Sequence, residues 1–135
     1  MNMRNNLLVN NHKKENVMAS WIFSKNGRAK LIFDTDKLRS NRGRVVSWIY
    51  SNSIYSLRGK HIGWFENGVL YDNRNRVIGF LRDATGNLPY RPGMGGEPGM
   101  PGFSGTPGRP GFSGTPGRAG YGGWSEHDLD VYFEQ

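Results

Sequence analysis

Four basic side chains recur every sixteen residues and could together bind an anion. Each follows the glycine or asparagine of an equivalent short segment; the four are Arg28, Arg44, Lys60 and Arg76. Three further arginines stand two positions before three of them, at Arg42, Arg58 and Arg74. Cations that converge on one face bind phosphates and carboxylates through charge-assisted hydrogen bonds. If the four segments fold alike, the spacing predicts a cation ring that binds a nucleic-acid backbone, a nucleotide or an anionic head group. The alternative is that exposed turns carry solubilising charge, which also blunts sheet edges.

No other group of residues indicates catalysis or metal binding. Three histidines stand in unrelated contexts, at His12, His61 and His127. The run Asp34-Thr35-Asp36 is similar to the opening of a calcium loop, but Arg39 and Val45 occupy the positions that need glycine and a bidentate acid. No glycine-rich phosphate-binding string occurs, and the chain has no cysteine. The sequence therefore predicts a protein that is not an enzyme and that has no cofactor and no metal. Its expected function is that of a structural or protein-interaction module, with anion or nucleic-acid binding through the repeated basic residues as the alternative.

Charge and hydropathy narrow the class of partner. The formal net charge is +7, and the basic excess lies in the first 84 residues, whereas the remainder is acidic. Such a field favours nucleic acid or another polyanion, while a protein partner or self-association stays open. The longest apolar run near the start is Leu7-Leu8-Val9, too short for a signal peptide, and nothing approaches the roughly 20 apolar residues of a spanning helix. Soluble and cytoplasmic is the expectation, with no membrane span.

The cationic positions belong to four tandem copies of a sixteen-residue unit. The copies are residues 21–36, 37–52, 53–68 and 69–84. In the third copy, β-branched and aromatic residues flank a Ser-x-x-Gly tetrad, Ser56 to Gly59, and Asn67-Gly68 closes the unit. The tetrad and the Asn-Gly pair are both turn chemistry, since glycine and asparagine tolerate positive φ. Each unit is therefore predicted to be a hairpin of two short strands.

Four hairpins around a pseudo-four-fold axis would bury their apolar strips and leave no exposed sheet edge. The predicted fold class is thus all-β. A bulky column is predicted to fill the interior: Ile32, Trp48, Trp64 and Phe80. A neighbouring column becomes small in the later copies, as is typical where backbones approach closely: Leu31, Ser47, Gly63 and Gly79.

The repeated motif [IL]-[FY]-[SD]-x-x-G-[RK]-x-[IV]-G-[WF] resembles that of the bacterial four-fold β-flower proteins. That family also tends to carry a Pro/Gly/Arg-rich segment and a closing Trp-Ser followed by an aromatic pair, and Gly123-Trp124-Ser125 and Tyr132-Phe133 match that ending here. The resemblance covers residues 21–135. Arg39 and Lys30 depart from the motif, at positions where it has an aromatic and an aliphatic residue. The resemblance implies a fold and no particular activity.

The C-terminal third is of low complexity. After a linker at residues 85–92, glycine recurs at every third position through residues 93–123, and residues 102–110 nearly repeat as 111–119. Gly-x-y with proline is typical of polyproline II and of collagen. The segment could pack along the repeats, its glycines allowing close approach, form a semi-rigid spacer, or trimerise. Phe103 and Phe112, nine residues apart, would lie on one side of a three-residue helix, which favours packing.

Both ends of the chain carry further expectations. Residues 1–20 form a basic arm predicted to be disordered, of which the first 17 residues are either a dispensable extension or an anion-binding arm. Residues 124–135 form an acidic, aromatic helix, with Ser125 and Asp128 as a capping-box-like start and Leu129, Tyr132 and Phe133 on one face. Its acids could cover the cation ring and compete with an outside anion.

Overall fold

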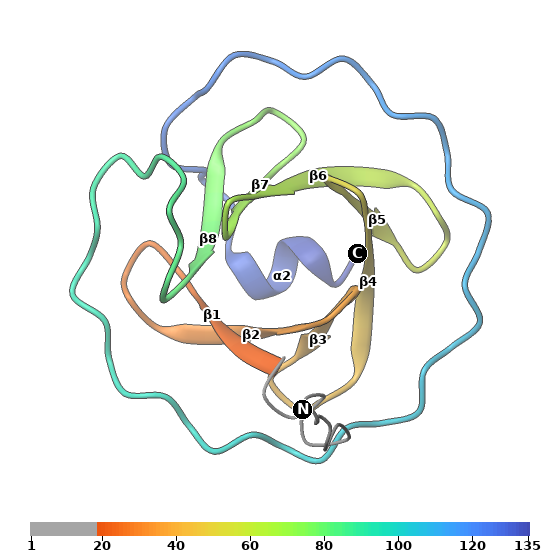
Figure 1. Cartoon of the computed structure of the whole chain (residues 1–135), viewed down its shortest axis with the longest axis horizontal. Coiled ribbons are helices and arrows are strands. Elements are labelled where there is room, and N and C mark those ends of the chain that lie inside the picture. The colour runs from red at the N-terminus through yellow and green to blue at the C-terminus, as the bar shows by residue number, and fades with distance from the viewer. Residues whose placement is uncertain (1–18) are drawn as a thin grey trace, which may run out of the picture.

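The computed structural model describes residues 19–135, which form a closed antiparallel β-barrel with one short helix (Figure 1). The strands are β1 (Ala19–Phe23), β2 (Ala29–Asp34), β3 (Lys37–Ser40), β4 (Val45–Tyr50), β5 (Ser53–Ser56), β6 (His61–Glu66), β7 (Val69–Tyr71) and β8 (Val77–Leu81). The helix is α2 (Leu129–Phe133). The prediction of an all-β fold is confirmed. Residues 1–18 of the predicted arm lie outside the described residues, and residues 19 and 20 already belong to β1.

Every strand pairs with its neighbours in sequence, and the first strand meets the last. β1 and β8 close the barrel through the pairs Ile22–Leu81 and Phe23–Phe80. Within each hairpin the register shifts at the equivalent position, which is between Ile22 and Phe23 in the first copy. A bulge of this kind bends the strand and raises its twist, as a small barrel needs. The closed circuit leaves no free strand edge between β1 and β8.

Two sets of turns alternate around the barrel. The tetrad turns, residues 24–27, 40–43, 56–59 and 72–75, join the two strands of each hairpin, and their last residue has positive φ: Gly27, Gly43, Gly59 and Asn75. The other set joins one hairpin to the next. Asn67-Gly68 fills that turn in the third copy, whereas Thr35 and Ser51 adopt positive φ in the first two, at 59° and 56°. A β-branched residue such as Thr35 is unusual in that conformation.

The barrel interior is aliphatic and is not the column expected from the sequence. Its buried cluster contains the residue that precedes each bulge and two residues near the C-terminus. Ile22, Leu38, Ile54 and Leu70 pack with Leu129 and Phe133. The predicted interior column is wrong, because Ile32, Trp64 and Phe80 belong to a separate cluster on the outer wall. Both faces of each strand are apolar, so alternation alone could not tell the inner face from the outer.

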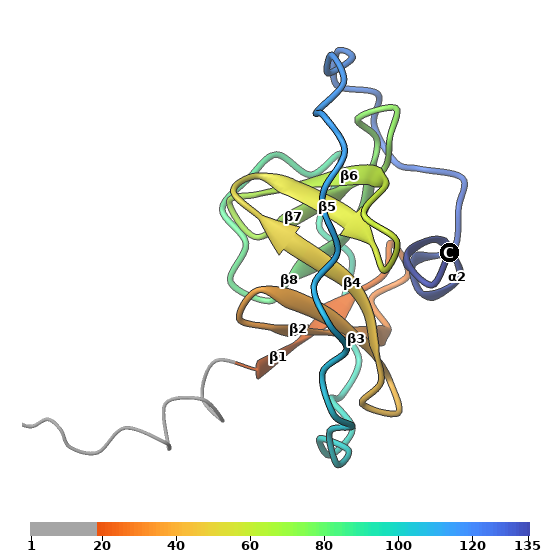
Figure 2. The ribbon, with the colours of Figure 1, turned by 90° about the vertical axis from the view of Figure 1, so that its right-hand side faces the viewer.

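The C-terminal residues 124–135, which we call the cap, close one end of the barrel (Figure 2). The column that becomes small in the later copies, at Ser47, Gly63 and Gly79, leaves room inside the barrel for this cap. A Cβ on Gly79 would lie 2.8 Å from Leu129 Cδ1, and a Cβ on Gly63 would meet both the Tyr71 carbonyl oxygen and Phe133. Ser47 Oγ donates to the Phe133 carbonyl oxygen at 2.7 Å. The close approach expected at this column is therefore partly between backbones and partly with the cap.

The predicted helical cap is shorter than expected and starts differently. α2 begins after Asp128, whose side chain makes no capping hydrogen bond. Ser125 does not cap the helix; its hydroxyl donates to Asp72 Oδ2 at 2.6 Å in a buried contact. The predicted apolar face is present, since Leu129 and Phe133 are fully buried and Tyr132 packs beside them.

Residues 93–123, which we call the belt, encircle the outer wall of the barrel (Figure 1). Four backbone N–H groups nine residues apart bind the four tetrad turns in order: Gly95, Ser104, Ser113 and Gly122 donate to the carbonyl oxygens of Gly27, Gly43, Gly59 and Asn75. The distances are 2.8, 3.1, 2.8 and 3.2 Å. Nine residues of belt therefore span one sixteen-residue repeat. Of the three arrangements considered for this segment, the structure has it packed along the repeats.

Belt side chains follow the same nine-residue spacing. Phe112 stacks on Tyr55 with 4.1 Å between ring centroids, and Phe103 lies under the Arg39 guanidinium at 4.3 Å. The docking expected of both phenylalanines is thus confirmed. In a second series, Arg109 lies over Trp48 at 5.3 Å and Arg118 over Trp64 at 5.2 Å. Cation–π contacts of this kind cover the bulky aromatic column that the strands turn outward.

The belt glycines do not provide the close approach expected of them. A Cβ added to Gly102, Gly105 or any other third-position glycine from residue 93 to residue 120 would meet no atom within 4 Å. The close approach comes instead from the tetrad turns. A Cβ on Gly27 or Gly43 would collide with the carbonyl oxygen of a belt residue. The third-position belt glycines thus face the outside, while the belt contacts the wall through side chains such as Arg109, Phe112 and Arg118.

Candidate anion-binding surface

All four tetrad turns have the same internal hydrogen bonds, so the residues after them are structurally equivalent. In the first copy, Ser24 N donates to the Arg28 carbonyl oxygen and Gly27 N to that of Ser24, both at 2.8 Å. The Ser24 hydroxyl also accepts from the backbone N–H groups of Asn26 and Arg28. Asp72 replaces serine in the fourth copy and accepts in the same way through Oδ1. The turn chemistry read from the sequence therefore fixes where each cation leaves the backbone.

The four turns lie at one end of the barrel, which we call the tetrad end, and the cap sits among them (Figure 2). The cations predicted from the sequence are all carried there: Arg28, Arg44, Lys60 and Arg76 directly follow the turns, and Arg42, Arg58 and Arg74 lie within them. All are exposed except Arg76, which is partly buried. The hairpins thus gather the predicted residues at one end of the molecule.

The cap neutralises part of this set of cations. Arg44 Nη2 lies 3.4 Å from Glu134 Oε1, and Arg76 Nη1 lies 3.2 Å from Glu126 Oε1. In each pair one side chain is more than half exposed to solvent, so each pair contributes about 0–1 kcal/mol to stability. Within residues 19–135, no carboxylate oxygen lies within 4 Å of the side-chain nitrogens of the other five predicted cations.

Two lysines of the first copy enlarge the set beyond the predicted residues. Lys30 Nζ lies 4.0 Å from Asp130 Oδ1, and Lys25 Nζ donates to the Ser125 carbonyl oxygen at 3.3 Å. Lys30 replaces an aliphatic residue of the other three copies, and that departure from the repeat was the one signal in the sequence for its role. Together with Arg28, both lysines line a hollow of about 110 Å³ against the cap.

A larger hollow of about 510 Å³ opens between the third and fourth tetrad turns and the cap. Lys60 and Arg74 line it from the barrel, and His127, Val131 and Tyr132 line it from the cap. Burial raises the pKa of the Tyr132 hydroxyl, and the nearby Asp72 carboxylate raises it further. The hydrogen bond from Asn73 N partly offsets this increase in pKa. Tyr132 therefore stays neutral at physiological pH.

The belt arginines and Arg39 do not belong to this surface. Arg39 is buried, and its guanidinium donates to Asp34 Oδ2 at 2.7 Å and to the carbonyl oxygens of Gly43 and Ser104. It therefore ties the end of β2 and the second tetrad turn to the belt. This explains the departure from the family motif at that position: the planar fork of arginine satisfies three acceptors.

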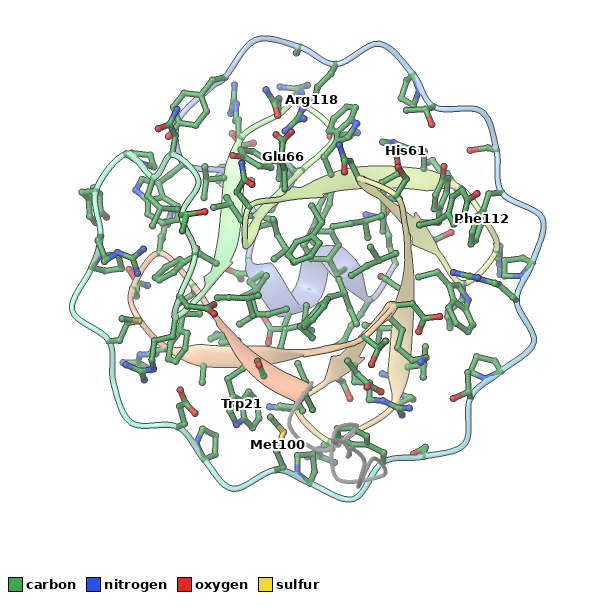
Figure 3. All side chains as sticks on the ribbon, in the orientation of Figure 1. Trp21, His61, Glu66, Met100, Phe112 and Arg118 are labelled. Atoms are coloured by element: carbon green, nitrogen blue, oxygen red, sulfur yellow. The ribbon has the colours of Figure 1, made fainter. Side chains whose placement is uncertain are left out.

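The histidines provide no metal site in the part of the chain that the structure covers, where no cluster of three metal-binding side chains occurs. His61 lies under the belt, with Nε2 3.1 Å from Ser53 Oγ and its ring against Tyr55 and Trp64 (Figure 3). Burial lowers the pKa of the His61 imidazole. His127 is exposed on the cap.

In the described range, the helical residues 129–133 are far too few to cross a bilayer.

Comparison with known proteins places the chain in one family and gives no relative of known activity. No curated protein and no solved structure matches the chain. A family model described as "4-fold beta flower protein" matches residues 20–133, which include the strands, the belt and most of the cap. The closed circuit of four hairpins agrees with that description, and the chain belongs to the 4-fold beta flower protein family.

Proposed function

We propose that this protein is a non-enzymatic binding module whose tetrad end binds a polyanion such as a nucleic-acid backbone. The observation that carries the proposal is the collection of basic side chains at one end of the barrel, most of them exposed and without a carboxylate partner among residues 19–135. Their equivalent positions on four turns present these cations together at one end, where a single extended ligand could contact several of them. Each turn offers one or two cations to successive phosphates.

The framework around the surface holds the tetrad turns in place. The belt donates hydrogen bonds to all four tetrad turns and the cap forms hydrogen bonds with the fourth, so belt and cap together hold the turn backbone. A turn backbone held in this way loses little conformational freedom on binding. The rival function is a structural or protein-interaction module with no polyanion ligand.

The cap adds a means of limiting affinity. Glu126 and Glu134 pair with Arg76 and Arg44, so an incoming phosphate must compete with two carboxylates of the same chain. Removing the whole cap would expose the barrel interior, because Leu129 and Phe133 fill it. The double variant Glu126→Gln and Glu134→Gln removes the competition and leaves the core intact. It is expected to bind polyanions several-fold more tightly than the parent chain.

Fluorescence anisotropy with a labelled oligonucleotide, at about 50 mM and about 200 mM salt, tests the proposal. The triple variant Arg42→Gln, Arg58→Gln, Arg74→Gln is expected to bind more weakly, with a salt slope smaller by about one for each phosphate that the protein no longer neutralises. Arg82→Gln is the control for removal of a single charge, since Arg82 is exposed, pairs with Glu97 and follows β8 at the other end of the barrel. Absence of binding at low salt would exclude the proposal and leave the structural or protein-interaction module.

A further inference from the structure

The hollow of about 510 Å³ at the tetrad end combines two exposed cations with an aromatic surface. Lys60 and Arg74 contribute the charge, and no carboxylate within the described part of the chain pairs with either. The lining carboxylate, Glu126, is already engaged with Arg76 at 3.2 Å. The cationic side of the hollow is therefore available to an anion.

The aromatic side of the hollow is held in place by hydrogen bonds. The Tyr132 hydroxyl donates to the Ile62 carbonyl oxygen at 2.6 Å and accepts from Asn73 N at 3.0 Å. The His127 ring lies over Tyr132, with 5.0 Å between centroids and 33° between planes. Tyr132 is thus fixed to strand β6 and to the fourth tetrad turn, and the exposed His127 ring packs against it and lines the same hollow.

An exposed apolar side chain completes the hollow. Val131 is 68% exposed, although its neighbours Leu129 and Phe133 on the same short helix are fully buried. It lines the hollow beside Tyr132. A ligand that carries charge alone would make no use of Val131 or of the ring pair, whereas a flat apolar ligand attached to a phosphate would cover both.

We propose that this hollow binds one unstacked base, with its adjacent phosphates, of a single-stranded nucleic acid. The proposal rests on the proposed function and specifies its ligand. The base stacks on His127 against Val131, and the phosphates lie on Lys60 and Arg74. Sequence preference is weak, because stacking accepts every base. A duplex keeps its bases paired and stacked, so it uses the cations alone.

Two probes of equal backbone charge separate this proposal from the polyanion function. A short oligothymidylate and an abasic oligonucleotide of the same length are each titrated into the full-length protein. The oligothymidylate is expected to bind about tenfold more tightly, the range that base–aromatic stacking provides. Equal affinity for the two probes would overturn the base site and retain the polyanion surface. Failure of both probes to bind would overturn both proposals.

Variants of His127 test whether the base stacks on this ring. His127→Ala leaves the buried core untouched, since His127 is exposed. It is expected to lower the affinity for oligothymidylate several-fold and to leave the affinity for the abasic probe unchanged. His127→Phe keeps a stacking face and is expected to restore binding. Equal weakening of both probes by His127→Ala, or no effect on either, would contradict a base stacked on this ring.

Discussion

The tetrad turns and the belt both depend on regularly spaced glycines, yet the barrel requires glycine in only one of them. At the turns, Gly43 has a φ of 90°, and a Cβ there would collide with the Gly102 carbonyl oxygen. In the belt, a Cβ on Gly105 or Gly114 would enter open space. The same residue type is a steric necessity in the first region, whereas in the second a side chain on any third-position glycine from residue 93 to residue 120 would point away from the barrel.

This contrast identifies which partner sets the register between belt and barrel. The fixed points are the turn carbonyl oxygens, which accept from the belt at nine-residue intervals, and the wall side chains, which the belt arginines and aromatic residues cover. The three-residue glycine period sets only which face of the belt points outward. Changes at the turns and at the wall residues should therefore cost more than changes along the belt glycines.

Gly43→Ala is expected to give the largest effect. The positive φ and the collision with the belt backbone together should lower the free energy of unfolding by about 2–4 kcal/mol. Urea denaturation measures the decrease, and limited proteolysis should cut the belt sooner. Asn75→Gly is the matched control at the fourth turn, where Asn75 Nδ2 donates to the Ala119 carbonyl oxygen and Oδ1 accepts from Arg118. A stability of Gly43→Ala equal to that of the parent chain would mean that the belt does not contact the second turn.

Arg109→Ala tests how belt side chains hold the wall. The Arg109 guanidinium lies 5.3 Å from the rings of both Trp48 and Phe112, and Nη2 donates to the Ile49 carbonyl oxygen. Removal of these interactions should cost about 1–2 kcal/mol in urea denaturation and shift the tryptophan emission. Arg109→Lys keeps the charge without the planar group and is expected to recover only part of that stability. Full recovery by lysine would show that charge alone matters at this position.

The sequence was sufficient for the hairpins and insufficient for what covers them. Turn chemistry at Ser56 to Gly59 and the sixteen-residue period located strands, turns and cations, because each depends on neighbouring residues. The assignment of Trp48 and Trp64 to the interior was wrong, since the choice between the two apolar faces depends on belt and cap residues far along the chain. The outward direction of the belt glycines was also unpredictable, because a three-residue period does not say which face meets the barrel.

The location of the candidate surface could be predicted from the sequence, but its ion pairs and its hollow could not. Equivalent turns carried Arg28 and its counterparts to one end, as their spacing indicated. The acidic composition of residues 124–135 suggested that they could cover the cations, but which cations pair, Arg44 and Arg76, depends on how these residues dock, and no local pattern encodes that. The hollow that joins Lys60 to Tyr132 depends on the same docking.

His61 gives a pH-dependent and smaller test of the packing between belt and wall. Burial lowers the pKa of the folded-state imidazole below the ordinary value of 6.5, so the unfolded chain binds the proton first as the pH falls. Stability should therefore decrease as the pH falls below 6.5 and level off once the folded state is also protonated. Denaturation of the parent chain and of His61→Gln, from about pH 7.5 to about pH 5, measures this. A parallel dependence in both proteins would assign it to other groups.

The smallest effect is expected for the belt glycines. Gly105→Ala and Gly114→Ala place a methyl group in open space, and each should change the free energy of unfolding by no more than about 0.5 kcal/mol. A modest gain in stability is compatible with outward-facing glycines, because alanine restricts the unfolded chain. A decrease as large as that of Gly43→Ala would erase the contrast and show that the outward face of the belt has a partner.

Hydrogen exchange of the belt amides, followed by NMR, tests most directly whether nine belt residues pair with each sixteen-residue repeat. The backbone N–H groups of Gly95, Ser104, Ser113 and Gly122 donate to the four turns, so they should exchange more slowly than the belt amides between them. Protection that recurs every nine residues is the predicted result. Uniformly fast exchange from residue 93 to residue 123 would mean that the belt is a free spacer and does not cover the barrel wall.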